Sequence, residues 1–346
     1  MTPPIRVLVV DDSAFARKVL REVLSGSGID VVGTARDGLE ALEKIAALQP
    51  DVITLDLVMP NLDGLGVLQH LPVQGAPRVI IVSVSDVETE LGAEALSAGA
   101  LDIVRKPTAL ATQQLYELRD ELVQKIRLAA SARSPSMTHA PLPAARASVA
   151  LLPRRTDLRH DIIVLGTSTG GPQAITRLMA ALPANLPVPM AIALHIPPGY
   201  TGALAARLNA LSALEVLEAE QGLELRAGRV VLARGGVHLE LARSPRGPVV
   251  TLDHMQGKAP HAPSVDRLLR SAVALYGART LGVVLTGMGD DGAQGAAAIR
   301  AAGGSVLTES EISCVVYGMP RCVKEAGHSS AEAPIEGMAA AIISHL

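Results

Sequence analysis

The sequence predicts two α/β domains in tandem, each built on a doubly wound, mainly parallel sheet. A length of 346 residues suits roughly two domains. Short apolar runs alternate with segments of helical periodicity in both halves, as in parallel sheets covered by helices on both faces. Residues 131–158 are rich in Ser, Pro, Ala and Arg and have no sustained period, which is typical of a linker. We therefore expect domains at residues 1–130 and 159–346.

Composition excludes several classes of protein. The formal net charge is −3, so a nucleic-acid partner held by a basic face is not expected. Two cysteines are too few for a disulfide framework or a four-cysteine zinc site. The N-terminus lacks the pattern of a signal peptide, and the most apolar long window, residues 179–198, is interrupted by five prolines. We expect a cytoplasmic protein that does not insert into membranes.

The first half predicts five strands, most of them followed by a helical pattern. The expected strands are Ile5–Val10, Val31–Thr34, Val52–Leu55, Val79–Val82 and Asp102–Val104. An amphipathic pattern over Ala109–Ser131 predicts a helix that closes this domain.

The second half repeats the alternation of strand and helix. The expected strands are Ile162–Leu165, Ala191–Leu194, Val230–Leu232, Val249–Leu252, Leu281–Leu285 and Ser305–Thr308. Polar and glycine-rich segments follow several of them directly, which is where open α/β sheets bind their ligands.

Acidic residues gather at strand ends in the first half. Asp11 and Asp12 follow the first expected strand, and Asp56 follows the third. Carboxylates brought this close need a cation, and hard oxygen ligands suit Mg²⁺. Ser83 and Lys106, at two further strand ends, add a hydroxyl and an ammonium group, so the set is suited to phosphoryl transfer onto an Asp. The simpler interpretation is that each Asp only caps a helix.

Residues 5–127 resemble a response-regulator receiver domain, which has a flavodoxin-like fold. The matching segments are Val-Asp-Asp-Ser (10–13), Leu-Asp-Leu-Val-Met-Pro-Asn-Leu-Asp-Gly (55–64), Ile-Val-Ser (81–83) and Arg-Lys-Pro (105–107). The resemblance implies that Asp56 is the phosphoacceptor and that Asp11 and Asp12 join it in holding Mg²⁺. It also implies that Ser83 is the switch hydroxyl and that Lys106 contacts the phosphoryl group.

A possible nucleophile stands at the start of the second half. Gly166-Thr167-Ser168-Thr169-Gly170 fits the G-x-S-x-G pattern, in which a sharp turn between strand and helix exposes a serine. Glycine-rich turns of this kind also hold phosphates, so the pattern alone leaves two interpretations. His195, at the end of an apolar strand, is the best candidate for a base, although a hydrogen-bonded core histidine would look the same. Asp290 and Asp291 are equally placed to orient it.

The order Ser, His, Asp differs from the Ser, Asp, His order of α/β-hydrolases. Residues 159–346 instead resemble the catalytic domain of the CheB family of chemotaxis protein-glutamate methylesterases. The matching segments are Gly-Thr-Ser-Thr-Gly-Gly (166–171), His-Ile-Pro-Pro-Gly-Tyr-Thr (195–201), Gly-Gly-Val-His-Leu (235–239), Pro-Ser-Val-Asp-Arg-Leu (263–268), Leu-Thr-Gly-Met-Gly-Asp-Asp-Gly-Ala (285–293) and Tyr-Gly-Met-Pro-Arg (317–321).

This resemblance implies an esterase domain in which Ser168 is the nucleophile, His195 the general base and Asp291 the orienting acid. The backbone near Met288 contributes to an oxyanion hole, and Thr169 supports the site. The implied reaction hydrolyses glutamate γ-methyl esters on methyl-accepting chemotaxis receptors to glutamate and methanol, without a metal, and extends to receptor glutamines. A chemotaxis histidine kinase is the implied phosphodonor, and phosphorylation of the receiver is expected to relieve inhibition of the esterase.

Two other functions remain open from the sequence. The glycine-rich loops suit a phospho-regulated module that binds a nucleotide or phosphate without catalysis, and Ser168→Ala separates the two hypotheses. A DNA-binding response regulator is disfavoured because the second half lacks a short helix-turn-helix unit and a dense basic stretch.

Overall fold

The structure is a computed structural model that describes residues 3–72, 75–83, 89–106, 112–131, 158–254 and 261–346. The chain divides into two compact units, Met1–Met137 and Thr138–Leu346. The expected linker, 131–158, lies outside the described residues except for its first and last positions. None of the helices in these ranges combines the length and apolar character that crossing a bilayer requires.

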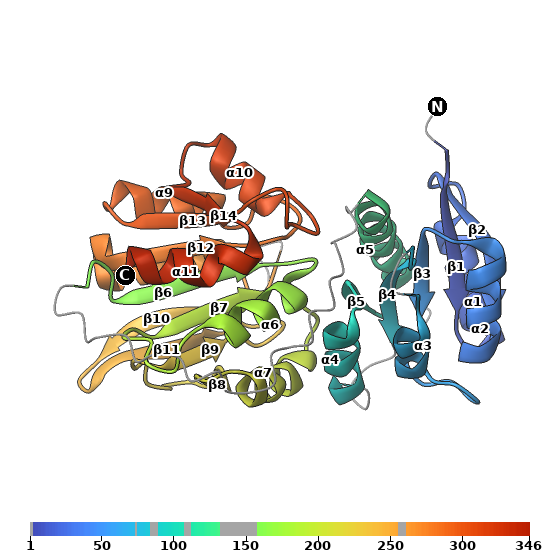
Figure 1. The fold of residues 1–346 in the computed structure, drawn as a ribbon, viewed down its shortest axis with the longest axis horizontal. Helices are drawn as coiled ribbons and strands as arrows, with labels where there is room; N and C mark the ends of the chain where they lie inside the picture. Colours follow the sequence, from blue (N-terminus) through green and yellow to red (C-terminus); the bar gives the residue numbers. More distant parts are fainter. Residues whose placement is uncertain (1–2, 73–74, 84–88, 107–111, 132–157, 255–260) are drawn as a thin grey trace. The chain divides into compact units, whose positions relative to one another are not determined.

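The N-terminal unit is a five-stranded parallel sheet in the order β2-β1-β3-β4-β5 (Figure 1). Its strands are β1 (Ile5–Val10), β2 (Ile29–Ala35), β3 (Val52–Leu55), β4 (Arg78–Ser83) and β5 (Asp102–Arg105). Its helices are α1 (Ala14–Leu24), α2 (Gly38–Leu48), α3 (Gly64–His70), α4 (Thr89–Ala98) and α5 (Thr112–Ser131). Contacts of α1 with α5 and of α3 with α2 and α4 give the two helical layers of the flavodoxin-like fold.

Strand burial explains the apolar runs of this unit. All four residues of β3 and the last four of β1 are buried, as expected for central strands covered on both faces. The helices that follow start with side-chain caps, because Ser13, Asp37 and Asp63 each accept an N–H three residues on. Asp12, unlike Asp37 and Asp63, is not the residue that caps its helix.

The C-terminal unit has a seven-stranded parallel sheet in the order β14-β13-β12-β6-β7-β9-β8. These strands are β6 (Ile162–Thr167), β7 (Met190–Leu194), β8 (Glu215–Glu218), β9 (Arg229–Leu232), β12 (Thr280–Val284), β13 (Ser305–Glu309) and β14 (Ala331–Ala333). A separate antiparallel hairpin pairs β10 (His238–Ser244) with β11 (Gly247–Asp253). The run at Val249–Leu252 thus forms part of this hairpin, and the sequence reading missed β8, β10 and β14.

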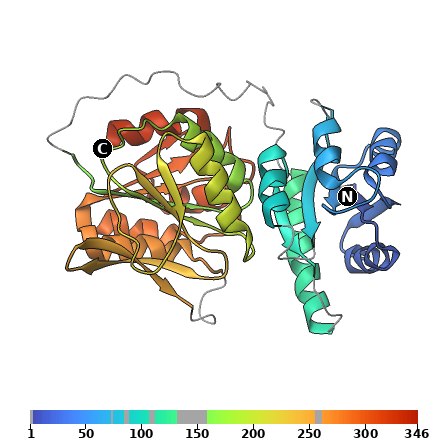
Figure 2. The same ribbon diagram turned by 90° about the horizontal axis from the view of Figure 1, so that it is seen from below.

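Helices cover both faces of the second sheet (Figure 2). They are α6 (Gly171–Ala181), α7 (Tyr200–Leu211), α8 (Val265–Tyr276), α9 (Ala293–Ala301), α10 (Met319–Glu325) and α11 (Ile335–His345). Helix α6 contacts α7 and α11, whereas α8 contacts α9 and the hairpin strand β10. The chain moves from β6 outward to β7, and later returns to build β12, β13 and β14 on the other side. The carboxyl ends of β6 and β12 therefore border a topological switch point, where ligands bind in open sheets.

Candidate active site

The predicted acidic residues meet at the carboxyl edge of the N-terminal sheet. Val10 pairs with Leu55, so Asp11 and Asp56 leave neighbouring strands at the same level. Carboxylate oxygens of Asp11, Asp12 and Asp56 lie within 4.8 Å of one another. Asp11 and Asp56 are buried, whereas Asp12 is exposed. This acidic cluster is typical of a Mg²⁺ site, because it offers only hard oxygen donors.

Lys106 connects two of these carboxylates. Its Nζ lies 2.6 Å from Asp11 Oδ2 and 2.6 Å from Asp56 Oδ2. Burial acts to lower the pKa of Lys106, but the charges of Asp56 and Asp11 outweigh it and hold the pKa above its usual value. Lys106 N–H also donates to the carbonyl of Ser83, a buried residue that ends β4 beside β3. The structure thus places all five predicted receiver residues at one edge.

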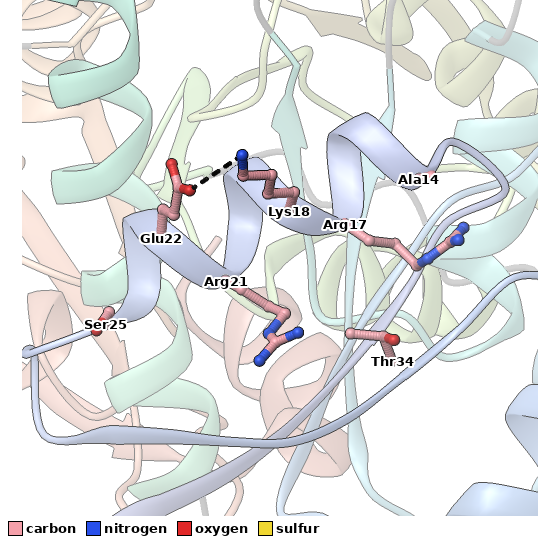
Figure 3. Close-up of a pocket in the computed structure, with 7 residues that line it drawn as sticks. All are labelled: Ala14, Arg17, Lys18, Arg21, Glu22, Ser25 and Thr34. Atoms are coloured by element: carbon pink, nitrogen blue, oxygen red, sulfur yellow. Dashed lines mark ion pairs between the residues drawn. The ribbon is translucent and has the colours of Figure 1, made fainter.

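Arg17 is a residue of this site that sequence reasoning missed. Its guanidinium donates to the carbonyls of Asp11 (2.6 Å) and Asp12 (2.9 Å), which fixes the backbone that presents both carboxylates. Figure 3 shows it with Lys18 and Arg21 on α1. These three residues help to line a cavity of about 480 Å³. The signal in the sequence is a basic residue one turn beyond the cap Ser13, too common a pattern to be singled out.

Ser168 lies in the turn between β6 and α6. Its N–H donates to Thr286 O (3.1 Å), and its carbonyl accepts from Gly171 N (2.7 Å), so the turn is held from both sides. Gly170 adopts a φ of 78°, which glycine reaches without strain. A Cβ there would also lie 2.6 Å from Val315 Cβ. The turn leaves Ser168 partly exposed at the end of a wholly buried strand.

His195 leaves the neighbouring strand at the same level as Ser168. Thr167 pairs with Leu194, and His195 N donates to Thr167 O (3.1 Å). Adjacent strands lie about 4.8 Å apart, so the two residues start side by side. The imidazole Nε2 is 2.8 Å from Asp291 Oδ2, and each of these two side chains is about one-tenth exposed. The structure therefore brings Asp291 to the imidazole, whereas the side chain of Asp290 is exposed.

Asp291 is held by the first turn of α8. Its Oδ2 accepts Val265 N (2.8 Å), and its Oδ1 accepts Asp266 N (2.8 Å) and Ser264 Oγ (3.1 Å). Burial acts to raise the pKa of Asp291, but the hydrogen bond from His195 and the two backbone N–H groups outweigh it and lower the pKa. Asp291 is thus kept ionised and aimed at the imidazole, the role of the third member of a serine–histidine–acid set.

The predicted oxyanion loop lies against Ser168. A Cβ on Gly287 would come within 2.9 Å of both Ser168 N and Ser168 Cβ. Within the described part of the chain, no acceptor is assigned to the N–H of Met288, the next residue. Thr169 is buried, and its carbonyl accepts Thr286 Oγ1 (3.0 Å). Backbone N–H groups of such turns stabilise developing oxyanions.

Two more residues of this site were missed by sequence reasoning. The ring of His261 stacks on that of His195, with centroids 4.3 Å apart and planes inclined by 23°. Glu309, which ends β13, is buried and accepts Thr286 N (2.8 Å) and Ser313 Oγ (2.8 Å). Its position at a strand end was a usable signal, whereas nothing in the spacing of His261 marks it.

Comparisons with known proteins match both units. The model of the CheB methylesterase family matches residues 163–342, and that of the response regulator receiver domain matches residues 7–117. Protein-glutamate methylesterase/protein-glutamine glutaminase 5 of Myxococcus xanthus (strain DK1622) is 59% identical over 347 residues, 99% of this chain and 98% of that protein. The protein-glutamate methylesterase/protein-glutamine glutaminase of Symbiobacterium thermophilum is 44% identical, over 98% of this chain and 96% of its own.

A solved structure matches the second unit. The crystal structure of the Thermotoga maritima CheB methylesterase catalytic domain aligns with a TM-score of 0.53 and 38% identity. The alignment covers 54% of this chain and 99% of that one.

Proposed function

The chain belongs to the CheB methylesterase family, and we propose that Ser168, His195 and Asp291 carry out its hydrolysis. It is a receiver-regulated protein-glutamate methylesterase and protein-glutamine glutaminase. Its proposed substrates are γ-methyl esters and γ-amides of methyl-accepting chemotaxis receptors. Its proposed domains are a receiver at residues 1–130, a linker at 131–158 and a catalytic domain at 159–346.

The proposed mechanism follows from the contacts of His195. Because Asp291 engages Nε2, Nδ1 is the ring nitrogen that accepts the hydroxyl proton of Ser168. Ser168 Oγ then attacks the ester carbonyl, the backbone N–H of Met288 stabilises the oxyanion, and Thr169 supports the site. The imidazolium returns the proton to the leaving oxygen, and methanol departs.

Water completes the reaction. His195 takes a proton from the water, whose oxygen attacks the acyl-enzyme carbonyl, and the proton then returns to Ser168 Oγ as the glutamate carboxylate leaves. A glutamine follows the same course with ammonia as the first leaving group. No step needs a metal.

The receiver carries the proposed control. Asp56 accepts a phosphoryl group from a chemotaxis histidine kinase, and Asp11, Asp12 and Asp56 are the residues that would hold Mg²⁺. Mg²⁺ would neutralise charge on the transferring phosphoryl group. Lys106, already 2.6 Å from Asp56, would pair with the phosphoryl oxygens, and Ser83 would supply a hydroxyl to them. The proposed location is the cytoplasm, with no nucleic-acid partner.

The 2.8 Å contact of His195 with Asp291, beside the Ser168 turn, carries this proposal. Receptor membranes labelled in their methyl groups test it through the release of volatile methanol. The wild-type chain with Mg²⁺ and a small phosphodonor should release label, and Ser168→Ala should be slower by more than about 10³-fold. Ser344→Ala, on α11, is the matched control and should match wild type. An active Ser168→Ala protein would refute the nucleophile and favour a phosphate-binding role for the turn.

A further inference from the structure

At the N-termini of helices α8 and α9, a carboxylate from each side accepts backbone N–H groups of the other helix. Asp291, which precedes α9, accepts two backbone N–H groups of the first turn of α8. In return Asp266, in that first turn, directs Oδ1 at Gly292 N (2.9 Å) and Gly295 N (2.7 Å) of α9. Each helix is thus capped by a carboxylate from the other.

Helix α9 depends on this exchange because it has no cap of its own. Its N-cap residue is Gly292, which has no side chain and a φ of 105°. The first N–H groups of a helix lack intrahelical partners, and a nearby carboxylate satisfies both their hydrogen bonds and the helix dipole. Asp266 supplies that carboxylate, and Gly292 directly follows Asp291 in the chain. Asp266 therefore fixes the backbone from which the Asp291 side chain extends.

Close packing leaves this junction little freedom. Val265 lies so near Gly166 that a Cβ there would overlap its Cγ1, and a Cβ on Gly292 would lie 2.9 Å from the same atom. Leu269 packs against Gly295 in the same way, because a Cβ added at Gly295 would lie 2.5 Å from Leu269 Cβ. One turn of α8 thus contacts both the strand before Ser168 and the loop after Asp291.

The charges of the two carboxylates are accommodated differently. Burial raises the pKa of Asp266, and the charge of Asp291 adds to this shift. The hydrogen bonds from Gly295 and Gly292 and the charge of Arg270 oppose it without cancelling it. The pKa of Asp291 is lowered instead, as described above. Asp291 is the carboxylate that contacts His195, while Asp266 contacts only backbone N–H groups in its described hydrogen bonds.

We propose that Asp266 is a positioning residue for the hydrolysis, acting through the backbone of Gly292 on Asp291 and so on His195. This rests on the proposed function. This role requires a side chain at position 266 that is long enough to place an acceptor oxygen at Gly292 N and Gly295 N. It does not require a negative charge near the substrate. It predicts a loss in kcat with little change in KM, because the carboxylate of Asp266 is directed at the backbone of α9.

The test uses the full-length chain, activated with Mg²⁺ and a small phosphodonor, on methyl-labelled receptor membranes. Asp266→Ala removes the acceptor, and kcat should fall about 10- to 100-fold with KM within about twofold, as for a catalytic group displaced by about 1 Å. Asp266→Glu keeps an ionised acceptor but adds a methylene, so it should fold and still lose about tenfold in kcat. Asp266→Asn keeps the acceptor and its length, and should restore most of the activity. Asp253→Ala is the matched control, because the described hydrogen bond of Asp253 comes from Arg267 of the same helix (2.5 Å) and not from the backbone of α9.

A double-mutant cycle separates positioning from general damage. If Asp266 acts through Asp291, adding Asp266→Ala to Asp291→Ala should cost little more than Asp291→Ala alone. Independent effects that multiply would overturn the proposal. The proposal would also be overturned if Asp266→Glu and Asp266→Ala both kept the wild-type kcat while Ser168→Ala was inactive in the same assay. An active Ser168→Ala protein would instead refute the proposed function itself.

Discussion

Glu309 is a buried carboxyl group that ties together segments around the catalytic site. Its carboxylate accepts hydrogen bonds from the N–H of Thr286 and from the hydroxyl of Ser313. The hydroxyl of Thr286 in turn donates to Thr169 O. Ser313 Oγ also accepts Ile335 N (2.9 Å) from the start of α11. Burial raises the pKa of Glu309, and the hydrogen bonds from Thr286 and Ser313 offset this only in part. Stability should therefore depend on pH at this residue.

The direction of that dependence follows from linkage. The folded chain binds a proton at Glu309 more readily than the unfolded chain does, because its pKa is raised above the usual 4.5. The stability contributed by this group is thus complete below pH 4.5 and is lost as the pH rises through the folded pKa.

Glu309→Gln keeps an acceptor for Thr286 N but cannot ionise. We expect its free energy of unfolding, relative to wild type, to increase with pH across that window and to level off above it. Urea unfolding of both proteins at a series of pH values measures this difference. Glu220→Gln, at an exposed carboxyl group, is the control and should follow wild type. Parallel curves for Glu309→Gln and wild type would show that Glu309 ionises as readily in the folded protein as in the unfolded one.

Residues at strand ends were predictable, and residues joined to them through tertiary contacts were not. Asp11, Asp56 and His195 directly follow apolar runs, and the carboxyl ends of parallel strands meet at one edge whatever the sheet order. The approach of Asp266 to Gly292 depends on how two helices pack, which no local period encodes. The contact of His261 with His195 has the same origin.

The same reasoning applies to whole elements. Central strands such as β1 and β6 are buried on both faces and read as continuous apolar runs. The edge strand β8 has one buried residue among partly buried ones, and the hairpin strand β10 mixes buried with partly buried and exposed residues, which weakens the apolar signal. Strand β14 has three residues, too few for any pattern.

The contact of β6 with α8 gives a test of how these elements hold the site. Val265 occupies the space that a side chain at Gly166 would need. Gly166→Ala should therefore displace the first turn of α8, lower the free energy of unfolding by about 1–3 kcal/mol and slow methanol release. Val265→Ala, which removes the obstructing methyl groups, should cost about 1–3 kcal/mol alone through the cavity it leaves.

In the double variant, the new methyl group at 166 enters the space vacated at 265. Its destabilisation should be smaller than the sum of the single effects by about 1 kcal/mol or more. Urea unfolding of the four proteins gives this coupling energy. Strict additivity would mean that α8 accommodates a larger residue at 166 without touching Val265.

At the scale of the whole molecule, each compact unit has its own sheet and its own buried core. In the receiver unit, Lys106 already lies between two carboxylates, so phosphorylation of Asp56 would change the charge that this ammonium group faces. A charge change at a switch acts by shifting the populations of states that already exist. In the catalytic unit, the described hydrogen bonds of Asp291 come from His195, Ser264 and the first turn of α8, which all belong to the same unit.

Because the described hydrogen bonds that hold Asp291 lie within the catalytic unit, we expect this unit to work without the receiver. We expect a chain lacking residues 1–140 to release methanol without a phosphodonor, and faster than the unphosphorylated full chain by roughly 5- to 150-fold, the usual range for coupling between sites. Full-length Asp56→Asn is the control, since it should stay at the slow rate with or without phosphodonor. The comparison uses initial rates at equal concentrations of folded protein on the same labelled membranes. A truncated chain as slow as the unphosphorylated full chain would mean that the receiver does not inhibit, and that phosphorylation must assist hydrolysis directly.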